Sequence, residues 1–89
     1  MEKIRKHFYF SGRVQGVGFR YRSYYIAQSI GLTGWVRNLW DDRVEMEVQG
    51  KSASISRMLH ELKTDRYIVI TDMECEPKPL DEHETTFRH

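Results

Sequence analysis

The stretch GRVQGVGFR, residues 12–20, marks the point where a predicted strand passes into a predicted helix. On its N-terminal side, apolar and polar residues alternate over roughly residues 3–11, as in a half-buried strand. On its C-terminal side, residues 19–30 contain no Gly or Pro, and their apolar side chains recur on one helical face. Gly31 follows where a left-handed C-terminal cap belongs. The chain is therefore predicted to open with a strand, a glycine-rich loop over residues 11–18 and a helix.

The next two elements are predicted to form a β-hairpin. Residues 33–39 form its first strand, and residues 44–49, which alternate Val and Met with Glu and Gln, form its second strand. The turn between them is Trp40-Asp41-Asp42.

A second helix and a fourth strand are predicted after the hairpin. Apolar residues spaced i, i+3, i+4 and i+7 over residues 55–62 predict an amphipathic helix, with Ser52 or Ser54 as its N-cap. Residues 67–71 start a fourth strand that extends toward Cys75.

The order of these elements predicts the fold class. Pro77 and Pro79 are expected to bar regular structure, and residues 85–88 could add a short fifth strand at an edge. The order β-α-β-β-α-β predicts an α+β, ferredoxin-like sandwich, in which two helices cover one face of an antiparallel sheet. Residues 1–89 are expected to form one domain, because two domains would each be too short for a core.

Composition limits the class of protein. The chain is 39% hydrophobic and 12% aromatic, as is ordinary for a folded domain, and no apolar stretch is long enough to span a membrane. No apolar run follows the basic N-terminus, so no signal peptide is expected. The single cysteine, Cys75, cannot form a disulfide within the chain, which favours a cytoplasmic location.

The charges are unevenly distributed along the chain. Residues 1–40 contain seven Lys and Arg against one Glu, whereas residues 41–89 contain seven against twelve acidic residues. A basic first half favours an anionic ligand there, although chance sorting of charge along a short chain gives the same pattern.

The glycine-rich loop has the features of a phosphate-sized cradle. Gly12, Gly16 and Gly18 allow successive backbone N–H groups to point at one centre, and the positive end of the helix dipole lies next to them. Arg20 follows directly and offers a planar, charged fork to two oxygens of one anion. The alternative is a glycine-rich turn that merely connects a strand to a helix.

Three known phosphate-binding loops do not fit this stretch. A Walker A loop requires a Gly-Lys-Ser or Gly-Lys-Thr ending that is absent, and a dinucleotide fingerprint requires glycine where Tyr21 stands. A cysteine-based phosphatase loop requires its cysteine at the position of Val14. If the loop binds a phosphoryl group for transfer, we therefore expect water to be the attacking group.

Asn38 is the second candidate residue. In a ferredoxin-like sheet the strand after the first helix runs parallel to the first strand, so Asn38 is expected at the same edge as the loop. Its amide could hold a water by donating and accepting hydrogen bonds. Alternatively, the side chain serves only the following turn.

Two stretches carry a resemblance to a known family. GRVQGVGFR at residues 12–20 and GLTGWVRN at residues 31–38 match the two signatures of the acylphosphatase family. The resemblance is sharp over residues 10–38 and loose beyond residue 50. It implies a ferredoxin-like enzyme that hydrolyses the carboxyl-phosphate bond of acyl phosphates to a carboxylate and inorganic phosphate.

The resemblance also implies roles for individual residues. Arg20 is the phosphate-binding arginine and Asn38 orients the attacking water. The phosphate-binding loop comprises Val14, Gln15, Gly16, Val17, Gly18 and Phe19. The resemblance implies no metal and no cofactor, and a small acyl phosphate as substrate. Inorganic phosphate or sulfate is expected as a competitive ligand because it would fill the same cradle, and the protein is expected to be a monomer.

Some features depart from the family pattern. The hairpin turn lacks the usual Asp-Gly, so Asp42 is expected to adopt a positive φ. Segment 64–67 stands where the family tends to have a Gly-Pro-Pro type of sequence.

The two tryptophans are expected in different environments: Trp35 in the core and Trp40 on the surface.

Two other functions fit the sequence less well. An RNA-recognition domain has the same element order, but its RNP1 pattern is absent and Glu45 and Glu47 occupy the strand that would face RNA. A non-catalytic acylphosphatase-like module is the other alternative, whereas a chain of 89 residues favours the free enzyme.

Overall fold

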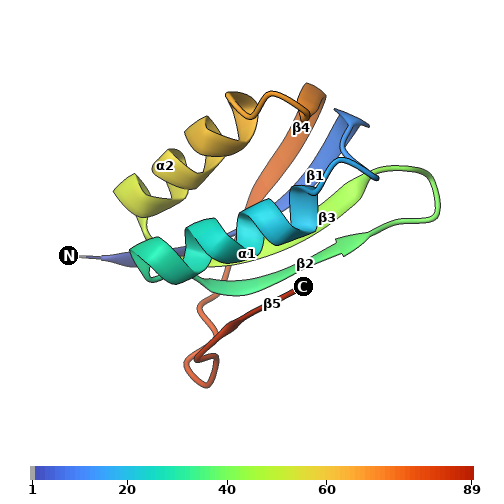
Figure 1. Cartoon of the computed structure of the whole chain (residues 1–89). Helices are drawn as coiled ribbons and strands as arrows, with labels where there is room; N and C mark the ends of the chain where they lie inside the picture. The colour runs from blue at the N-terminus through green and yellow to red at the C-terminus, as the bar shows by residue number, and fades with distance from the viewer. Residues whose placement is uncertain (1) are drawn as a thin grey trace.

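Five strands form one sheet in the computed structural model, which describes residues 2–89 (Figure 1). The strands are β1 (Lys3–Arg13), β2 (Thr33–Asn38), β3 (Val44–Lys51), β4 (Val69–Lys78) and β5 (Phe87–Arg88). They lie in the order β4-β1-β3-β2-β5. The first four strands pair antiparallel, while β5 pairs in parallel with β2. The ferredoxin-like order is thus confirmed, but the sheet is mixed and not purely antiparallel.

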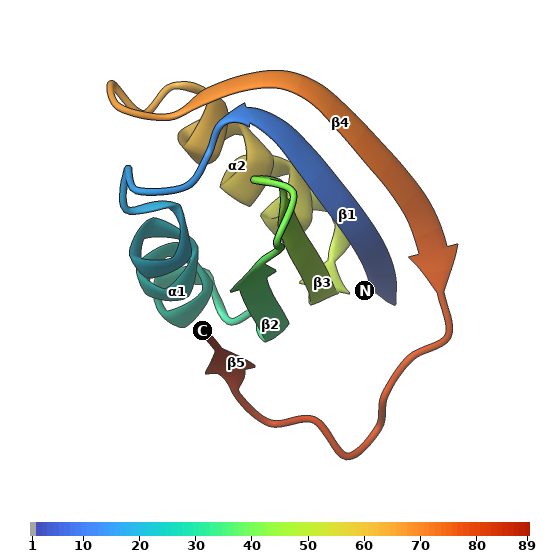
Figure 2. The ribbon, with the colours of Figure 1, turned by 90° about the vertical axis from the view of Figure 1, so that its right-hand side faces the viewer.

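The parallel strand results from the connection that precedes it. β4 and β5 lie at opposite edges of the sheet, and residues 79–86 carry the chain from one edge to the other (Figure 2). The chain arrives beside β2 and pairs with it only at Gly34 and Trp35. The predicted fifth strand therefore exists, but it is short.

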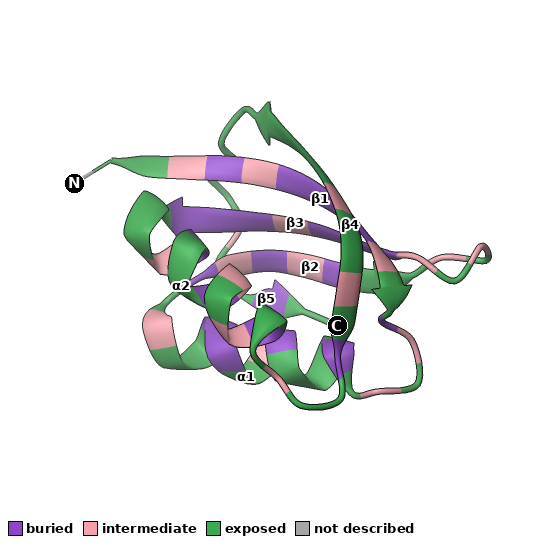
Figure 3. Ribbon diagram, turned by 90° about the horizontal axis from the view of Figure 1, so that it is seen from above, coloured by how far each residue is buried: buried purple, intermediate pink, exposed green. Residues whose placement is uncertain are grey.

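The helices α1 (Phe19–Ile30) and α2 (Ser52–Lys63) cover the same face of the sheet (Figures 1 and 2). The central strand β3 is mostly buried and the edge strand β4 is mostly exposed (Figure 3). The core between the layers includes Phe8, Phe10, Val36, Met46 and Val48 from the strands and Phe19, Ile26, Ala27, Ile55, Met58 and Leu62 from the helices. Burial of each large side chain contributes about 1.5–3 kcal/mol to stability.

The end of α1 agrees with the sequence. Gly31 has a φ of 75°, and the backbone N–H groups of Gly31 and Leu32 both donate to the Ala27 carbonyl. This left-handed cap turns the chain back toward the sheet, so that Leu32 is buried and β2 starts at Thr33.

The face of the sheet that the helices leave open carries a network of buried charges. Arg5 donates to Glu47 at 2.6 Å and to Glu84 at 2.8 Å. The His7 ring lies between Glu45 and Glu47, with one ring nitrogen against each carboxylate. Arg37 of β2 also donates to Glu45, so the network links β1, β2 and β3 to the connection between β4 and β5.

A pair of hydrogen bonds ties that connection to the sheet. The Asp81 N–H donates to Gln49 Oε1 at 2.8 Å, and Gln49 Nε2 donates to the Asp81 carbonyl at 3.0 Å. Residues 79–86 therefore follow a defined path to β5.

Trp35 lies on this open face, so its predicted place in the core is wrong. It alternates with Gly34 and Val36, which are buried, and it is itself only half-buried. Its ring meets the edge of the His7 ring at a centroid distance of 5.7 Å. Trp40 is 95% exposed in the hairpin turn, as predicted.

Two strand boundaries differ from the predictions because strand pairing decides them. β1 continues to Arg13, with a bulge between Ser11 and Gly12 opposite β4. β4 starts at Val69 and runs through Pro77, which was expected to bar regular structure. Proline is tolerated there because β4 is an edge strand.

The predicted serine cap of α2 is also wrong. The N-cap is Lys51, with no side-chain capping bond, and Ser52 is already the first helical residue. β3 ends at Lys51 and runs directly into α2, which leaves no loop residue to act as a cap.

Candidate functional site

The loop between β1 and α1 is shaped by two glycines in the left-handed region. Gly16 has a φ of 73° and Gly18 a φ of 81°. A Cβ added at either position would meet nothing within 4 Å, so the backbone conformation, and not lack of space, favours glycine there. Gly12, which was predicted to belong to this cradle, instead serves the strand bulge.

The N-terminus of α1 leaves its first N–H groups free. Gly18 is the N-cap and has no capping side chain, and no acidic residue lies in the first turn. The first helical bond runs from Arg22 N to the Gly18 carbonyl at 2.9 Å. Within residues 2–89, the N–H groups of Phe19, Arg20 and Tyr21 have no hydrogen-bond acceptor. These groups and the helix dipole together favour an anion.

A cavity of about 170 Å³ lies at this helix terminus. It is lined by Val14, Gly16, Gly18, Phe19, Arg20, Tyr21 and Asn38. We call it the cradle. It joins residues of the loop to the end of β2 because β1 and β2 both run antiparallel to β3, so that their C-terminal ends share one edge of the sheet.

The side chains of Arg20 and Asn38 are both exposed and free to bind a ligand. Among residues 2–89, neither side chain has a hydrogen bond or ion pair. The hairpin turn is held by Asp41, whose carboxylate accepts from the N–H of Arg43 at 3.3 Å and from its Nε at 2.8 Å. Asp42 has a φ of 72°, as the sequence predicts. The turn is therefore held without the Asn38 amide.

Two of the predicted loop residues do not line the cradle. Gln15 Nε2 donates to the Leu39 carbonyl at 2.7 Å and to the Arg43 carbonyl at 2.9 Å, so its side chain points at the hairpin. Val17 is half-buried and packs against the core. Gln15 thus fastens the loop to the residue that follows Asn38.

The sequence analysis did not predict that Tyr21 lines the cradle, nor that the Gln15 side chain links the loop to the hairpin. Tyr21 could have been found, since it lies in the first turn beside Arg20. The role of Gln15 had no local signal, because its acceptors are 24 and 28 residues further along the chain.

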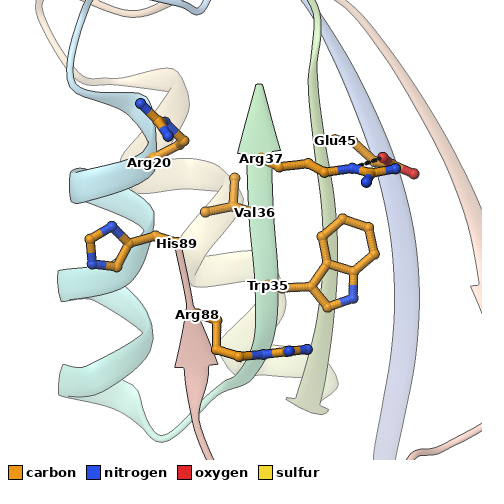
Figure 4. A pocket seen from close by; sticks show the side chains of 7 residues that line it. All are labelled: Arg20, Trp35, Val36, Arg37, Glu45, Arg88 and His89. Carbon is orange, nitrogen blue, oxygen red and sulfur yellow. Dashed lines mark hydrogen bonds and ion pairs between the residues drawn. The ribbon is translucent and has the colours of Figure 1, made fainter. Parts of the chain in front are cut away.

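A larger groove of about 540 Å³ adjoins the cradle and shares Arg20 with it. Its lining residues are Arg20, Trp35, Val36, Arg37, Glu45, Arg88 and His89 (Figure 4). Arg37 Nε donates to Glu45 at 2.6 Å. Burial alone would raise the pKa of the Glu45 carboxyl, but hydrogen bonds from Arg37 and His7 outweigh burial and hold that pKa below its usual value.

The described part of the chain shows neither a metal-binding cluster nor a membrane-spanning helix. Over residues 2–89, no group of three or more His, Cys, Asp and Glu side chains is arranged to hold a metal ion. Neither described helix is long and apolar enough to cross a membrane.

The fold and the cradle define the class of protein. It is a small two-layer α+β protein. At one edge of its sheet, the N-terminus of α1 with its free N–H groups, the unpaired Arg20 and Asn38 line one cavity. The chain belongs to the acylphosphatase family, because the family model described as Acylphosphatase matches residues 6–89.

Individual relatives agree with this assignment. An acylphosphatase of Geobacillus kaustophilus (strain HTA426) is 40% identical over 85 residues, which are 94% of this chain and 90% of that protein. The crystal structure of acylphosphatase from Bacillus subtilis matches with a TM-score of 0.86 and 30% identity over 96% of each chain.

The extent of the matches varies. Four other curated acylphosphatases align over only 46–63% of their own length. The crystal structure of full-length HypF in the phosphate- and nucleotide-bound form matches with a TM-score of 0.86 and 27% identity, covering 98% of this chain and 12% of that one. A similar domain thus also forms part of a larger protein.

Proposed function

We propose that this protein is an acylphosphatase, which hydrolyses acyl phosphates to a carboxylate and inorganic phosphate. One observation carries the proposal: the free N–H groups of α1, the unpaired Arg20 and the uncommitted Asn38 share one cavity. Membership of the acylphosphatase family supports it. The proposal treats residues 1–89 as one functional domain.

In the proposed reaction the cradle binds the phosphoryl group. The N–H groups of the first helical turn and the guanidinium of Arg20 donate to the phosphoryl oxygens and compensate their charge. Both sets of donors are available, since neither has to break a bond within the described residues to bind the anion. A free phosphate or sulfate ion would occupy the same donors and inhibit.

Asn38 orients the attacking water in this proposal. The water oxygen forms a bond to phosphorus while the bond from phosphorus to the carboxyl oxygen breaks, and the electron pair leaves with the carboxylate. One proton of the water passes to a phosphoryl oxygen and the other stays on the attacking oxygen, so the products are a carboxylate and dihydrogen phosphate. A carboxylate is a good leaving group, so positioning and charge compensation supply most of the catalysis.

Water is favoured over a protein nucleophile by the lining of the cradle. Val14 stands where a cysteine phosphatase loop carries its thiol, and the lining contains no Ser, Cys or His. Cys75 is exposed on β4, outside the cradle. We further propose a reducing, cytoplasmic location, which a lone unpaired thiol favours, and a monomeric enzyme.

Hydrolysis of benzoyl phosphate tests the proposed function. We expect release of benzoate and phosphate that is unaffected by EDTA and competitively inhibited by inorganic phosphate. Loss of activity in EDTA with recovery on adding a divalent metal would contradict the proposed mechanism. A rate that high phosphate leaves unchanged would contradict the assignment of the cradle.

A further inference from the structure

The groove beside the cradle follows the uncovered edge of β2. β5 pairs with β2 only at Gly34 and Trp35, so the edge strand stops short of Val36–Asn38. Figure 4 shows Arg20 and His89 on the α1 side of this edge, and Trp35 and Arg37 on the other side. A ligand whose phosphoryl group lies in the cradle would extend into this groove, because Arg20 lines both.

The groove carries uncompensated positive charge. The one acidic side chain in its lining, Glu45, already accepts a hydrogen bond from Arg37 and is in contact with His7. Arg88 also lines the groove, is exposed, and has no ion pair or hydrogen bond among residues 2–89. Arg20 is assigned to the phosphoryl group and Arg37 is paired with Glu45. Arg88 is therefore the arginine of the groove that is available to bind a second anion.

Two apolar side chains of β2, Val36 and Trp35, line the groove on opposite sides of the strand. Val36 is buried, and the Trp35 ring is held by the His7 ring edge and by the Arg37 guanidinium at 5.4 Å from its centroid. A held aromatic ring offers a flat surface for the carbon skeleton of a ligand. The volume of about 540 Å³, against about 170 Å³ for the cradle, leaves room for an acyl group with a further substituent.

We propose that this groove binds the acyl part of the substrate and selects acyl phosphates whose acyl part carries a second anionic group, which Arg88 binds. The inference rests on the proposed function. Arg88 is thereby a specificity-determining residue: it acts on the choice of acyl group and not on the attacking water.

A matched pair of substrates tests the preference. Benzoyl phosphate and 4-carboxybenzoyl phosphate share the ring and the reacting bond and differ by one carboxylate. At low ionic strength we expect a higher kcat/KM for 4-carboxybenzoyl phosphate, by about tenfold, as for one charge-assisted hydrogen bond. Added NaCl should lower this ratio, because the groove is open to solvent.

Substitution of Arg88 tests the residue. In Arg88→Gln, kcat/KM for 4-carboxybenzoyl phosphate should fall about tenfold, with a smaller fall for benzoyl phosphate, so that the ratio approaches one. Arg57→Gln is the matched control: it removes the same charge from an exposed residue of α2, and the wild-type ratio should persist. Circular dichroism checks that both variants are folded, and the salt dependence of the wild-type ratio needs no variant.

The outcomes separate this inference from the proposed function. If folded wild-type protein hydrolyses neither substrate, the proposed function fails and the inference fails with it. If both substrates are hydrolysed but the charged one is not preferred, or if Arg88→Gln keeps the wild-type ratio, the proposed function stands and the selection by Arg88 is overturned.

Discussion

The proposed roles of Arg20 and Asn38 predict different kinetic effects of substitution. Asn38→Ala leaves the cradle donors intact and removes the group proposed to orient water, so kcat should fall by about 10²–10³-fold while phosphate still inhibits. Arg20→Lys keeps the charge but loses the two-pronged fork, so phosphate inhibition and turnover should both weaken. Steady-state kinetics with phosphate as inhibitor checks both. A folded Asn38→Ala variant with near-normal kcat would show that the amide has no catalytic role.

Gln15 links the cradle loop to the hairpin, which makes it a positioning residue in the proposed mechanism. In Gln15→Ala the two carbonyls keep other partners, since Leu39 N still donates to the Arg43 carbonyl at 2.8 Å and Asp42 N to the Leu39 carbonyl at 3.3 Å. The expected loss of stability is therefore only about 1–2 kcal/mol. We expect kcat to fall about tenfold with little change in phosphate inhibition, because Asn38 shifts while Arg20 stays in place.

The control for Gln15 lies on α1. Gln28 is exposed and its Nε2 donates only to the Tyr24 hydroxyl, so Gln28→Ala should leave kcat unchanged. Equal kinetic effects of the two substitutions would remove Gln15 from the mechanism.

At the scale of the elements, the bulge in β1 depends on Gly12. Its φ is 123°, and a Cβ there would lie 2.2 Å from the Val69 carbonyl oxygen and 2.8 Å from Thr71 N. Gly12→Ala should therefore destabilise the protein by about 3 kcal/mol, through overpacking and backbone strain together. Gly16→Ala meets no neighbour and should cost only about 1–2 kcal/mol, the cost of the left-handed conformation. Urea unfolding of both variants measures the difference, and equal costs would contradict this account of the bulge.

Local sequence predicted the elements but not all of their ends. The helices and the hairpin follow from periodicity and from Gly31, all of which act within a few residues. The extent of β1 and of β4 depends on how the two strands pair across the bulge, which is a contact between distant segments. The site shows the same division between local and distant contacts. The motif of residues 12–20 predicted the cradle. The hydrogen bonds of Gln15 and the groove could not be predicted, because they depend on the folded hairpin and on β5.

For the whole molecule, the charge network on the open face predicts how stability depends on pH. Burial would raise the pKa of the Glu45 and Glu47 carboxyls, but Arg37, Arg5 and His7 hold both pKa values below the usual range. Carboxyls with a lowered folded pKa stabilise the protein above their unfolded pKa, near 4.3, and lose this contribution as the pH falls through the folded pKa. The urea midpoint should thus decline on acidification below about pH 5.

A variant tests the origin of this acid loss. Glu47→Gln removes one of the two carboxyls, so it should lower stability at pH 7 and flatten the dependence at low pH. If the variant declines with acid as steeply as the wild type, other carboxyls govern the transition.

The contact of His89 with α1 has a practical consequence for anyone who fuses this domain to another polypeptide. The His89 ring lies 4.5 Å from the Tyr24 ring and 5.2 Å from the Tyr21 ring, and Tyr21 lines the cradle. A tag or linker attached after His89 would therefore begin beside the cradle and, in the proposed mechanism, compete with incoming substrate. The start of β1 lies at the opposite end of that strand from the cradle, so the N-terminal side is the safer point of attachment.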